Sequence, residues 1–204
     1  TITGLKPGGR YTVKVAAVNW AGTGKPATVT GTAATTPTAV GTLKAVGKNA
    51  TIVATWAASA NTGGTPVTAY AIYASKTSTG PWTPIGLASG GSTTTTIKGL
   101  TNGTTYYIKV TAVNAIGRSA ATIAKATPCA PPGTPTIASI AAGSTTISPR
   151  WAASTPNGAA ITGYTIRWRK SGAAVWNTKQ LPHTARSFIV NGLTRNSTYT
   201  VEIE

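Results

Sequence analysis

Acidic side chains are almost absent from this chain of 204 residues. There is no Asp, and the two Glu residues, Glu202 and Glu204, both lie among the last three positions. Paired-carboxylate catalysis and oxygen-ligated metal sites depend on carboxylates, so the composition excludes both over nearly the whole chain. One Cys and one His are also too few for a zinc site.

Other scarce residues narrow the range of functions further. The single cysteine, Cys129, excludes an intramolecular disulfide, and the single histidine, His183, has no acid or nucleophile near it in the sequence. No apolar run reaches the roughly 18 residues that a membrane helix needs, so no membrane span is predicted. We therefore expect a protein that is not an enzyme and that holds no cofactor or metal.

Thr is the most frequent residue, with 41 occurrences, and cations far outnumber acids, with 18 Lys and Arg against two Glu. The formal net charge is +16 at pH 7, while apolar residues make up 41% of the chain, which is enough for a packed core. Solubility needs far less net charge than this, so the excess favours a contact with an anionic partner.

One sequence pattern occurs three times, beginning at Leu5, Leu100 and Leu193. In each copy a Tyr follows the Leu six residues later, and alternating apolar residues follow the Tyr, as in LKPGGRYTVKV and LTNGTTYYIKV. The copies are 95 and 93 residues apart, and Trp56 and Trp151 repeat with a spacing of 95. The chain is therefore a tandem repeat with a period of about 94 residues.

Each period contains several short segments in which apolar and polar residues alternate, separated by clusters of Gly, Asn, Ser and Pro. Alternation with a period of two residues is typical of strands with one buried face, and no segment shows the longer period of a helix. The sequence predicts an all-β fold of antiparallel β-sandwiches with essentially no helix.

Three landmarks recur within the period: a Trp in the second strand (Trp56, Trp151), a Tyr in the third strand (Tyr70, Tyr164), and the Leu-to-Tyr spacing at the sixth strand. In these landmarks the chain resembles the fibronectin type III family. The resemblance implies tandem immunoglobulin-like sandwiches with a tyrosine corner, in which the phenol bonds the backbone of the preceding loop. The high content of Thr and Gly is similar to that of tandem modules in secreted or cell-surface bacterial proteins. This resemblance implies an extracellular location.

The repeat divides the chain into one complete module and two partial ones. Residues 38–128 form a complete module, residues 1–36 hold the last three strands of another, and residues 131–204 form a module that lacks its last strand. The linkers near Pro37 and Pro128 are short and contain Pro, which favours a semi-rigid, extended string of modules.

Seven strands are predicted in the middle module (residues 38–128), at residues 41–46, 50–56, 67–75, 82–87, 93–100, 104–114 and 120–126. By the same register, Thr1–Leu5 is the end of a fifth strand and is expected to lie beside residues 10–19, with Val13 and Val15 facing inward. Three strands would not be stable alone, so we expect the missing strands to come either from further chain of the same protein or from another copy, in a larger assembly in which neighbouring copies or modules hold the modules in order.

Several residues have a predicted place in the sandwich. Trp56 and Trp151 are expected in the core rather than on a sugar-stacking platform, because small polar residues alternate with them. Trp20 follows the sixth strand of the first module and is expected to be exposed, where it could contact a ligand or a neighbour. Pro149 falls in a central strand and removes a hydrogen-bond donor, so a bulge or locally broken pairing is expected there.

Six basic residues are candidate contacts for an anionic partner. Arg167 and Arg169 alternate with apolar residues and should face outward, while Lys14 and Lys109 hold one shared outward strand position in the first two modules. The third module has Glu202 at that position. The full set of candidates is Lys14, Lys109, Arg150, Arg167, Arg169 and Lys170.

The alternative interpretation of these basic residues is an ordinary solvated surface. Specific nucleic-acid binding is not expected, because the basic groups are dispersed and no nucleic-acid-binding signature is present. An anionic surface glycan or an acidic neighbouring subunit fits a secreted module better.

Three N-x-[ST] sequons, at Asn49, Asn102 and Asn196, are candidate glycosylation sites. In a chain so rich in Thr, such sequons also arise by chance. Asn102 and Asn196 moreover lie in turns, where Asn is favoured for its backbone conformation.

The first functional hypothesis is a set of non-catalytic structural or spacer modules in an extracellular multi-module surface protein or filament, with contacts to anionic polymers or acidic subunits. The alternatives are an adhesion module, an accessory module of a secreted polysaccharide hydrolase, and a phage virion or tail surface protein. Salt separates adhesion from a pure spacer role, because binding to a charged polymer weakens as salt is added. A catalytic domain in the same protein would identify the hydrolase.

Overall fold

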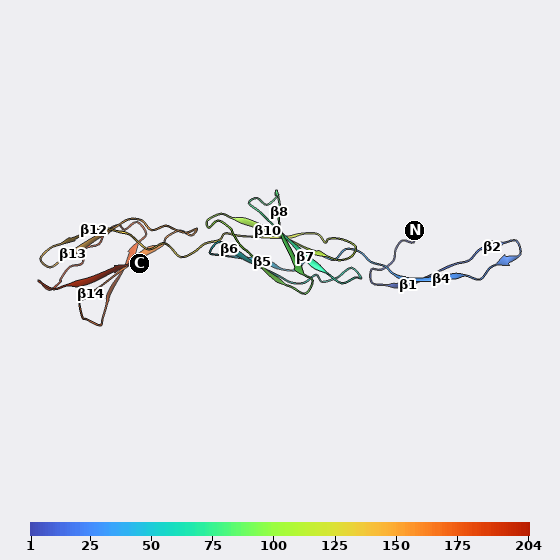
Figure 1. Cartoon of the computed structure of the whole chain (residues 1–204), viewed down its shortest axis with the longest axis horizontal. Coiled ribbons are helices and arrows are strands. Elements are labelled where there is room, and N and C mark those ends of the chain that lie inside the picture. Colours follow the sequence, from blue (N-terminus) through green and yellow to red (C-terminus); the bar gives the residue numbers. More distant parts are fainter. The chain divides into compact units, whose positions relative to one another are not determined.

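The computed structural model describes residues 1–204, which fall into two compact units, Thr1–Pro128 and Cys129–Glu204. All of its regular elements are β-strands, sixteen in number, so the prediction of an all-β fold without helix is confirmed (Figure 1). The structure accordingly has no helix of the length and apolarity needed to cross a bilayer. The predicted segments 1–36 and 38–128 both belong to the first unit.

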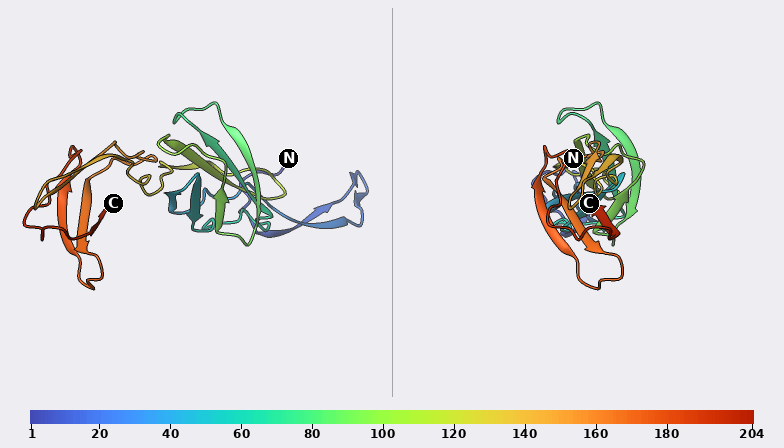
Figure 2. Two further views of the ribbon diagram at one scale, coloured as in Figure 1. Left: turned by 60° about the vertical axis from the view of Figure 1, so that its left-hand side comes forward. Right: turned by 90° about the vertical axis from the view of Figure 1, so that its left-hand side faces the viewer.

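Two sheets form the middle module (Figure 2). One has the strand order β5-β6-β9 and the other the order β11-β10-β7-β8, and all neighbouring strands are antiparallel. Each of the seven strands overlaps its predicted range. Their bounds are β5 (Leu43–Lys48), β6 (Thr51–Trp56), β7 (Ala69–Ser75), β8 (Thr83–Ser89), β9 (Thr94–Ile97), β10 (Tyr106–Val113) and β11 (Thr122–Ala126).

Alternation along these strands builds the core of the middle module. In β10, Ile108 and Val110 are completely buried, whereas Lys109 between them lies on the outer face of the sheet. Trp56 of β6 and Tyr70 of β7 meet across the two sheets, with ring centroids 5.3 Å apart. The inward-facing prediction for Trp56 is therefore confirmed.

The tyrosine corner is present in all three copies of the repeat. In each, the phenol oxygen accepts a hydrogen bond from the backbone N–H five residues earlier, which fixes the loop that precedes the strand. The three bonds are Lys6 to Tyr11 (2.8 Å), Thr101 to Tyr106 (3.2 Å) and Thr194 to Tyr199 (3.0 Å). This prediction is confirmed.

Residues 1–36 contain a two-stranded ribbon rather than a sandwich (Figure 1). Its long strands, β1 (Arg10–Val15) and β4 (Ala27–Thr32), pair with each other, and the short strands β2 (Val18–Asn19) and β3 (Gly22–Thr23) extend the ribbon. Trp20 lies in the turn between β2 and β3 and is 99% exposed, as the sequence predicted.

The predicted strand at Thr1–Leu5 is not formed, and β1 pairs with β4 alone. The middle module explains the error, because its fifth strand, β9, pairs with β6 and lies in a different sheet from β10. Adjacent segments in the sequence are therefore not neighbours in the sheet. Val13 is half-buried, but Val15 is 68% exposed, so the inward-facing prediction for Val15 is wrong.

The second unit repeats the architecture with fewer strands. One sheet pairs β12 with β13, and the other has the order β15-β14-β16. Trp151 and Tyr164 again meet, with ring centroids 5.8 Å apart, and both are buried, as are Ile166 and Val190 of the same unit. The strands are β12 (Ile137–Ala142), β13 (Ile147–Trp151), β14 (Gly163–Lys170), β15 (Asn177–Pro182) and β16 (Tyr199–Ile203).

Pro149 interrupts the pairing of β13 along one of its edges. Toward β12 it stays in register opposite Ile140. On the edge that faces residues 186–190, the backbone N–H groups of Ile147 and Trp151 donate hydrogen bonds. Pro149 lies between them and has no N–H, so only isolated bridges form along this edge. The corresponding edge of β6 carries the continuous strand β9, so the predicted local break in pairing is confirmed.

Candidate functional site

The basic stripe predicted in the third module is partly neutralised. Arg167 of β14 forms ion pairs with Glu202, at 3.3 Å, and with Glu204. Arg169 stacks on Trp176, with its guanidinium carbon 4.3 Å from the ring centre, and Arg167 lies 5.8 Å from the same ring. The two acids of the chain therefore compensate the charge at the centre of this stripe.

The remaining predicted basic contacts of the second unit, Arg150 and Lys170, are exposed and form no ion pair. Lys14 of β1 is also exposed, and it lies on the face of the ribbon opposite to Val13 and Val15. These side chains are available to solvent, but no aromatic ring or acid holds them in place.

Lys109 has a different environment, because its ammonium group lies between two aromatic rings. The nitrogen is 4.5 Å from the ring centre of Tyr73 and 4.4 Å from that of Trp82. The β10–β7 register places Lys109 directly opposite Tyr73, and Trp82 immediately precedes β8, the next strand of the sheet. Each such cation–π contact stabilises by about 0.5–1 kcal/mol at an exposed site.

Arg118 extends this stack from Tyr73. Its guanidinium carbon lies 5.8 Å from the Tyr73 ring centre, and its Nη1 donates a hydrogen bond to the Tyr73 hydroxyl. An isolated bridge between Val113 and Arg118 holds the backbone of Arg118 beside the end of β10. Successive side-chain contacts therefore alternate between aromatic and cationic groups, in the order Trp82, Lys109, Tyr73 and Arg118.

Tyr107 and Lys125 complete the surface. They lie opposite each other in the β10–β11 register, and Tyr107 is two residues from Lys109, so it shares its outward side. Thr111 lies on this same side of β10, is only 7% exposed, and has no hydrogen-bond partner for its hydroxyl. We call this surface the cation–aromatic face; it consists of Tyr73, Trp82, Tyr107, Lys109, Arg118 and Lys125.

The cations of the cation–aromatic face have no acid to pair with. Residues 1–128 contain eleven Lys and Arg and no Asp or Glu, in contrast to the second unit, where Arg167 has two carboxylate partners. Stacking on aromatic rings holds a cation in place without neutralising it, so this face keeps its full positive charge.

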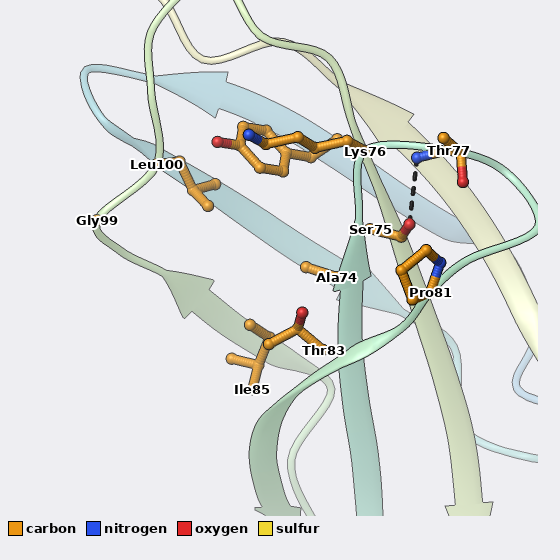
Figure 3. A pocket seen from close by; sticks show the side chains of 10 residues that line it. Ala74, Ser75, Lys76, Thr77, Pro81, Thr83, Ile85, Gly99 and Leu100 are labelled. Atoms are coloured by element: carbon orange, nitrogen blue, oxygen red, sulfur yellow. Dashed lines mark hydrogen bonds between the residues drawn. The ribbon is translucent and has the colours of Figure 1, made fainter.

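A cavity of about 500 Å³ lies beside the loops that follow β7 and β9 (Figure 3). Ile85, Leu100 and the ring of Tyr106 contribute to its largely apolar wall, and Lys76 is its one charged lining residue. The hydrogen bond from the Thr101 N–H, aided by the charge of Lys76, lowers the pKa of Tyr106 below the usual value for tyrosine. The cavity is thus a cleft beside the tyrosine corner.

The three sequons have different surroundings. Asn49 and Asn196 are exposed, whereas Asn102 is half-buried and its amide is bonded at both ends. Its Oδ1 accepts a hydrogen bond from the N–H of Ala50 (2.8 Å), and its Nδ2 donates one to Oδ1 of Asn49 (2.9 Å). Asn102 therefore links two turns through its side-chain amide.

The side chains that commonly bind metals are dispersed. No group of three or more His, Cys, Asp or Glu side chains lies close enough together to hold a metal ion. Cys129 is a free, half-buried thiol.

The sequence identified Lys109 as outward-facing but missed its aromatic partners. Tyr73 and Trp82 are more than 25 residues away from Lys109 in the chain, and only the order of strands β10, β7 and β8 brings the three together. A signal was available in the repeat, because Trp82 and Trp176 occupy matching positions 94 residues apart and each stacks on a cation.

The comparison with family models agrees with the architecture. A family model described as "Fibronectin type III domain" matches residues 36–125 and 130–204. Among solved structures, the chain is similar to the crystal structure of the chicken CNTN1 FN1-FN3 domains, with 20% sequence identity and a TM-score of 0.47. That alignment covers 98% of this chain and 70% of the other. No curated protein matches the chain by sequence.

Proposed function

Because the chain belongs to the fibronectin type III family, we propose that it is a non-catalytic spacer and adhesion segment of an extracellular multi-module surface protein. Domains of this family are generally structural or adhesive modules and are typically found in extracellular or cell-surface proteins. In this proposal the modules set distance, and their basic outer surfaces attach to an anionic polymer.

The spacer role is supported by the linker before the middle module, which is hydrogen-bonded to the module that follows it. The N–H of Thr35 donates to the carbonyl of Gly63 (2.8 Å), and Nδ2 of Asn114 donates to the carbonyl of Thr35 (2.8 Å). A Cβ at Gly63, where φ is +77°, would collide with the carbonyl oxygen of Thr35. Glycine therefore permits the close approach on which this contact depends.

The second linker is attached in a similar way. The N–H of Ala130 donates to the carbonyl of Asn157 (2.9 Å), and Nδ2 of Asn157 donates to the carbonyl of Pro131 (2.8 Å). A linker held by hydrogen bonds and stiffened by Pro bends less than a free Gly- and Ser-rich linker of the same length.

The adhesive role rests on one observation above all, the positive charge that has no counter-charge. Eleven cations and no Asp or Glu in residues 1–128 give the first unit a strongly positive net charge. Such a field attracts polyanions and raises their rate of association.

Binding of the full chain to immobilised polygalacturonate at increasing NaCl concentration tests the adhesive role. We expect binding at low ionic strength that is lost toward 1 M salt, where the screening length falls to about 3 Å. Uncharged dextran serves as the control polymer and should not bind. Absence of binding at low salt, or binding that salt does not weaken, would contradict the proposal.

A second partner that we propose is a neighbouring copy or module of a larger assembly. The observation that favours it is that the β1–β4 ribbon is only part of a sandwich. Its apolar residues Val15 and Val29, 68% and 64% exposed, would be covered by further strands, which either a module of the same protein or another copy can supply. Exposed apolar surface of this kind is favourably buried by association. Sedimentation velocity over a range of concentrations should detect self-association that weakens in a Val15→Thr/Val29→Thr variant; a monomer at all concentrations would exclude another copy as the partner.

A further inference from the structure

We propose that the cation–aromatic face of the middle module is a binding site for an acidic polysaccharide, a polymer of pyranose rings that carry carboxylates. This inference rests on the proposed adhesive function and assigns it to one surface. Lys109, Arg118 and Lys125 would pair with the carboxylates, and the exposed parts of the aromatic rings would contact the apolar faces of the sugars.

The first argument is that the cations are held in place before a ligand arrives. The ammonium group of Lys109 is fixed between the rings of Tyr73 and Trp82, at 4.5 and 4.4 Å from their centres. Arg118 is bonded to the Tyr73 hydroxyl. A long cationic side chain normally loses much rotamer freedom on binding, and this stacking removes part of that cost in advance.

The second argument is that these cations are free to take an anionic partner. The face of an aromatic ring attracts a cation but forms no strong hydrogen bond with its N–H groups. Lys109 and Arg118 therefore keep N–H groups that can donate hydrogen bonds to a ligand. Ligand oxygens would satisfy these groups.

The third argument comes from the corresponding surface of the second unit. Glu202 occupies the position of Lys109, nine residues after the repeated Leu, and it pairs with Arg167 at 3.3 Å. A contact between a Trp and a cation is present there too, between Trp176 and Arg169. The neighbouring cation, Arg167, however, already has an acidic partner. The site is therefore expected in the first unit and not in the second.

The experiment compares two double variants of the full chain that lose the same charge. Lys109→Gln/Arg118→Gln removes two cations of the face, and Lys44→Gln/Lys48→Gln removes two exposed cations from β5, in the opposite sheet. Dissociation constants for polygalacturonate are measured by calorimetry at one fixed salt concentration. Losing even one charge-assisted hydrogen bond weakens an equilibrium by roughly tenfold, so we expect a loss of at least about tenfold for the face variant and under about threefold for the control.

A third variant protects the result against a folding defect. Lys109→Arg keeps a cation that can stack between the same rings, so its affinity should stay within about threefold of the unmodified chain. Melting temperatures of all variants are measured alongside. If the Lys109→Gln/Arg118→Gln variant has the melting temperature of the unmodified chain and still binds with the affinity of the Lys44→Gln/Lys48→Gln control, the site is refuted, while the adhesive function stands. If the unmodified chain does not bind at all, the adhesive function fails and the site fails with it.

The class of ligand is tested with two other polyanions at equal charge concentration. Poly-L-glutamate has carboxylates but no rings, and an oligothymidylate has phosphates and bases that can also stack on aromatic side chains. We expect both to bind the unmodified chain more weakly than polygalacturonate. Equal or tighter binding of either one would overturn the assignment to a polysaccharide.

Discussion

At the scale of single residues, the two core tryptophans have matching surroundings in the two units. Trp56 is 4% exposed beside Tyr70, and Trp151 is 3% exposed beside Tyr164. In both, the indole nitrogen is buried and has no hydrogen-bond partner. The contribution of these side chains is therefore packing, which makes their loss predictable from the space they fill.

We predict that Trp56→Ala and Trp151→Ala each lower the free energy of unfolding of their own unit by about 3–5 kcal/mol, the usual result of emptying an aromatic core site. Differential scanning calorimetry of the full chain measures the two transitions. Trp20→Ala is the matched control, since that indole is 99% exposed and should change stability by less than about 0.5 kcal/mol. An unchanged transition in Trp56→Ala would contradict the core assignment.

Tyr106→Phe removes one hydrogen bond, from the Thr101 N–H, and keeps the ring. We predict a loss of about 0.5–1.5 kcal/mol in unfolding free energy, measured by urea titration near neutral pH. A loss above about 3 kcal/mol would mean that the ring, and not the bond, is disturbed in the variant.

The same bond gives a prediction for alkaline pH. Because the Thr101 N–H bond lowers the folded-state pKa of Tyr106, the folded protein loses this proton at a lower pH than the unfolded chain does. The resulting stabilisation is present above the unfolded pKa and is lost as the pH falls through the folded pKa. In a phenolate absorbance titration, Tyr106→Phe should remove an early-ionising component; an unchanged early part of the curve would contradict this.

At the scale of the elements, the alternation in the sequence predicted the strands but not their partners. All seven strands of the middle module were found, because each has the short alternating pattern of a strand between turn residues, and most of them contribute apolar side chains to the core. Thr1–Leu5 was wrongly paired with β1, because a single strand pattern does not say which sheet the strand joins. That choice depends on contacts between distant segments, as the β6–β9 pairing shows.

The candidate site was predictable to the same extent. The alternation of inward and outward side chains along β10 predicted that Lys109 lies on the outer face of the sheet, and the structure confirms this. The contacts of Lys109 with Tyr73 and Trp82 were not predictable from the alternation of side chains along β10. They require the register of β10 with β7 and the position of the loop before β8. The neutralisation of Arg167 by Glu202 depends likewise on the β14–β16 pairing.

Pro149 provides a test at this scale. Pro149→Ala restores a backbone N–H in β13 on the edge that faces residues 186–190, where only isolated bridges now form. We predict that the amides of residues 187–190 exchange with solvent about fivefold more slowly than in the unmodified chain, because one added hydrogen bond of roughly 1 kcal/mol suppresses local opening. Exchange followed by NMR measures this. Unchanged exchange in 187–190 would show that something other than the missing donor limits the pairing.

At the scale of the whole molecule, the absence of acids determines how the protein responds to pH. Acid unfolds most proteins because carboxylates that are ionised and paired in the native state become protonated. The first unit has no Asp or Glu to protonate. In the second unit, Glu202 and Glu204 pair with Arg167 at a surface where all three side chains are partly exposed, and such pairs contribute at most about 1 kcal/mol.

We predict that the unfolding free energy of the first unit changes by less than about 1 kcal/mol between pH 7 and pH 3, since no carboxylate of that unit loses a native contact. Calorimetry at constant ionic strength measures it, and the Trp56→Ala variant identifies which transition belongs to the first unit. The second unit is the internal control: its transition should fall slightly as the Arg167 ion pairs are lost. A fall of more than about 8 °C in the first transition would exceed the effect of 1 kcal/mol on a domain of this size. The eleven cations carry the same charge at both pH values, so their mutual repulsion could not cause such a fall, and the prediction would be wrong.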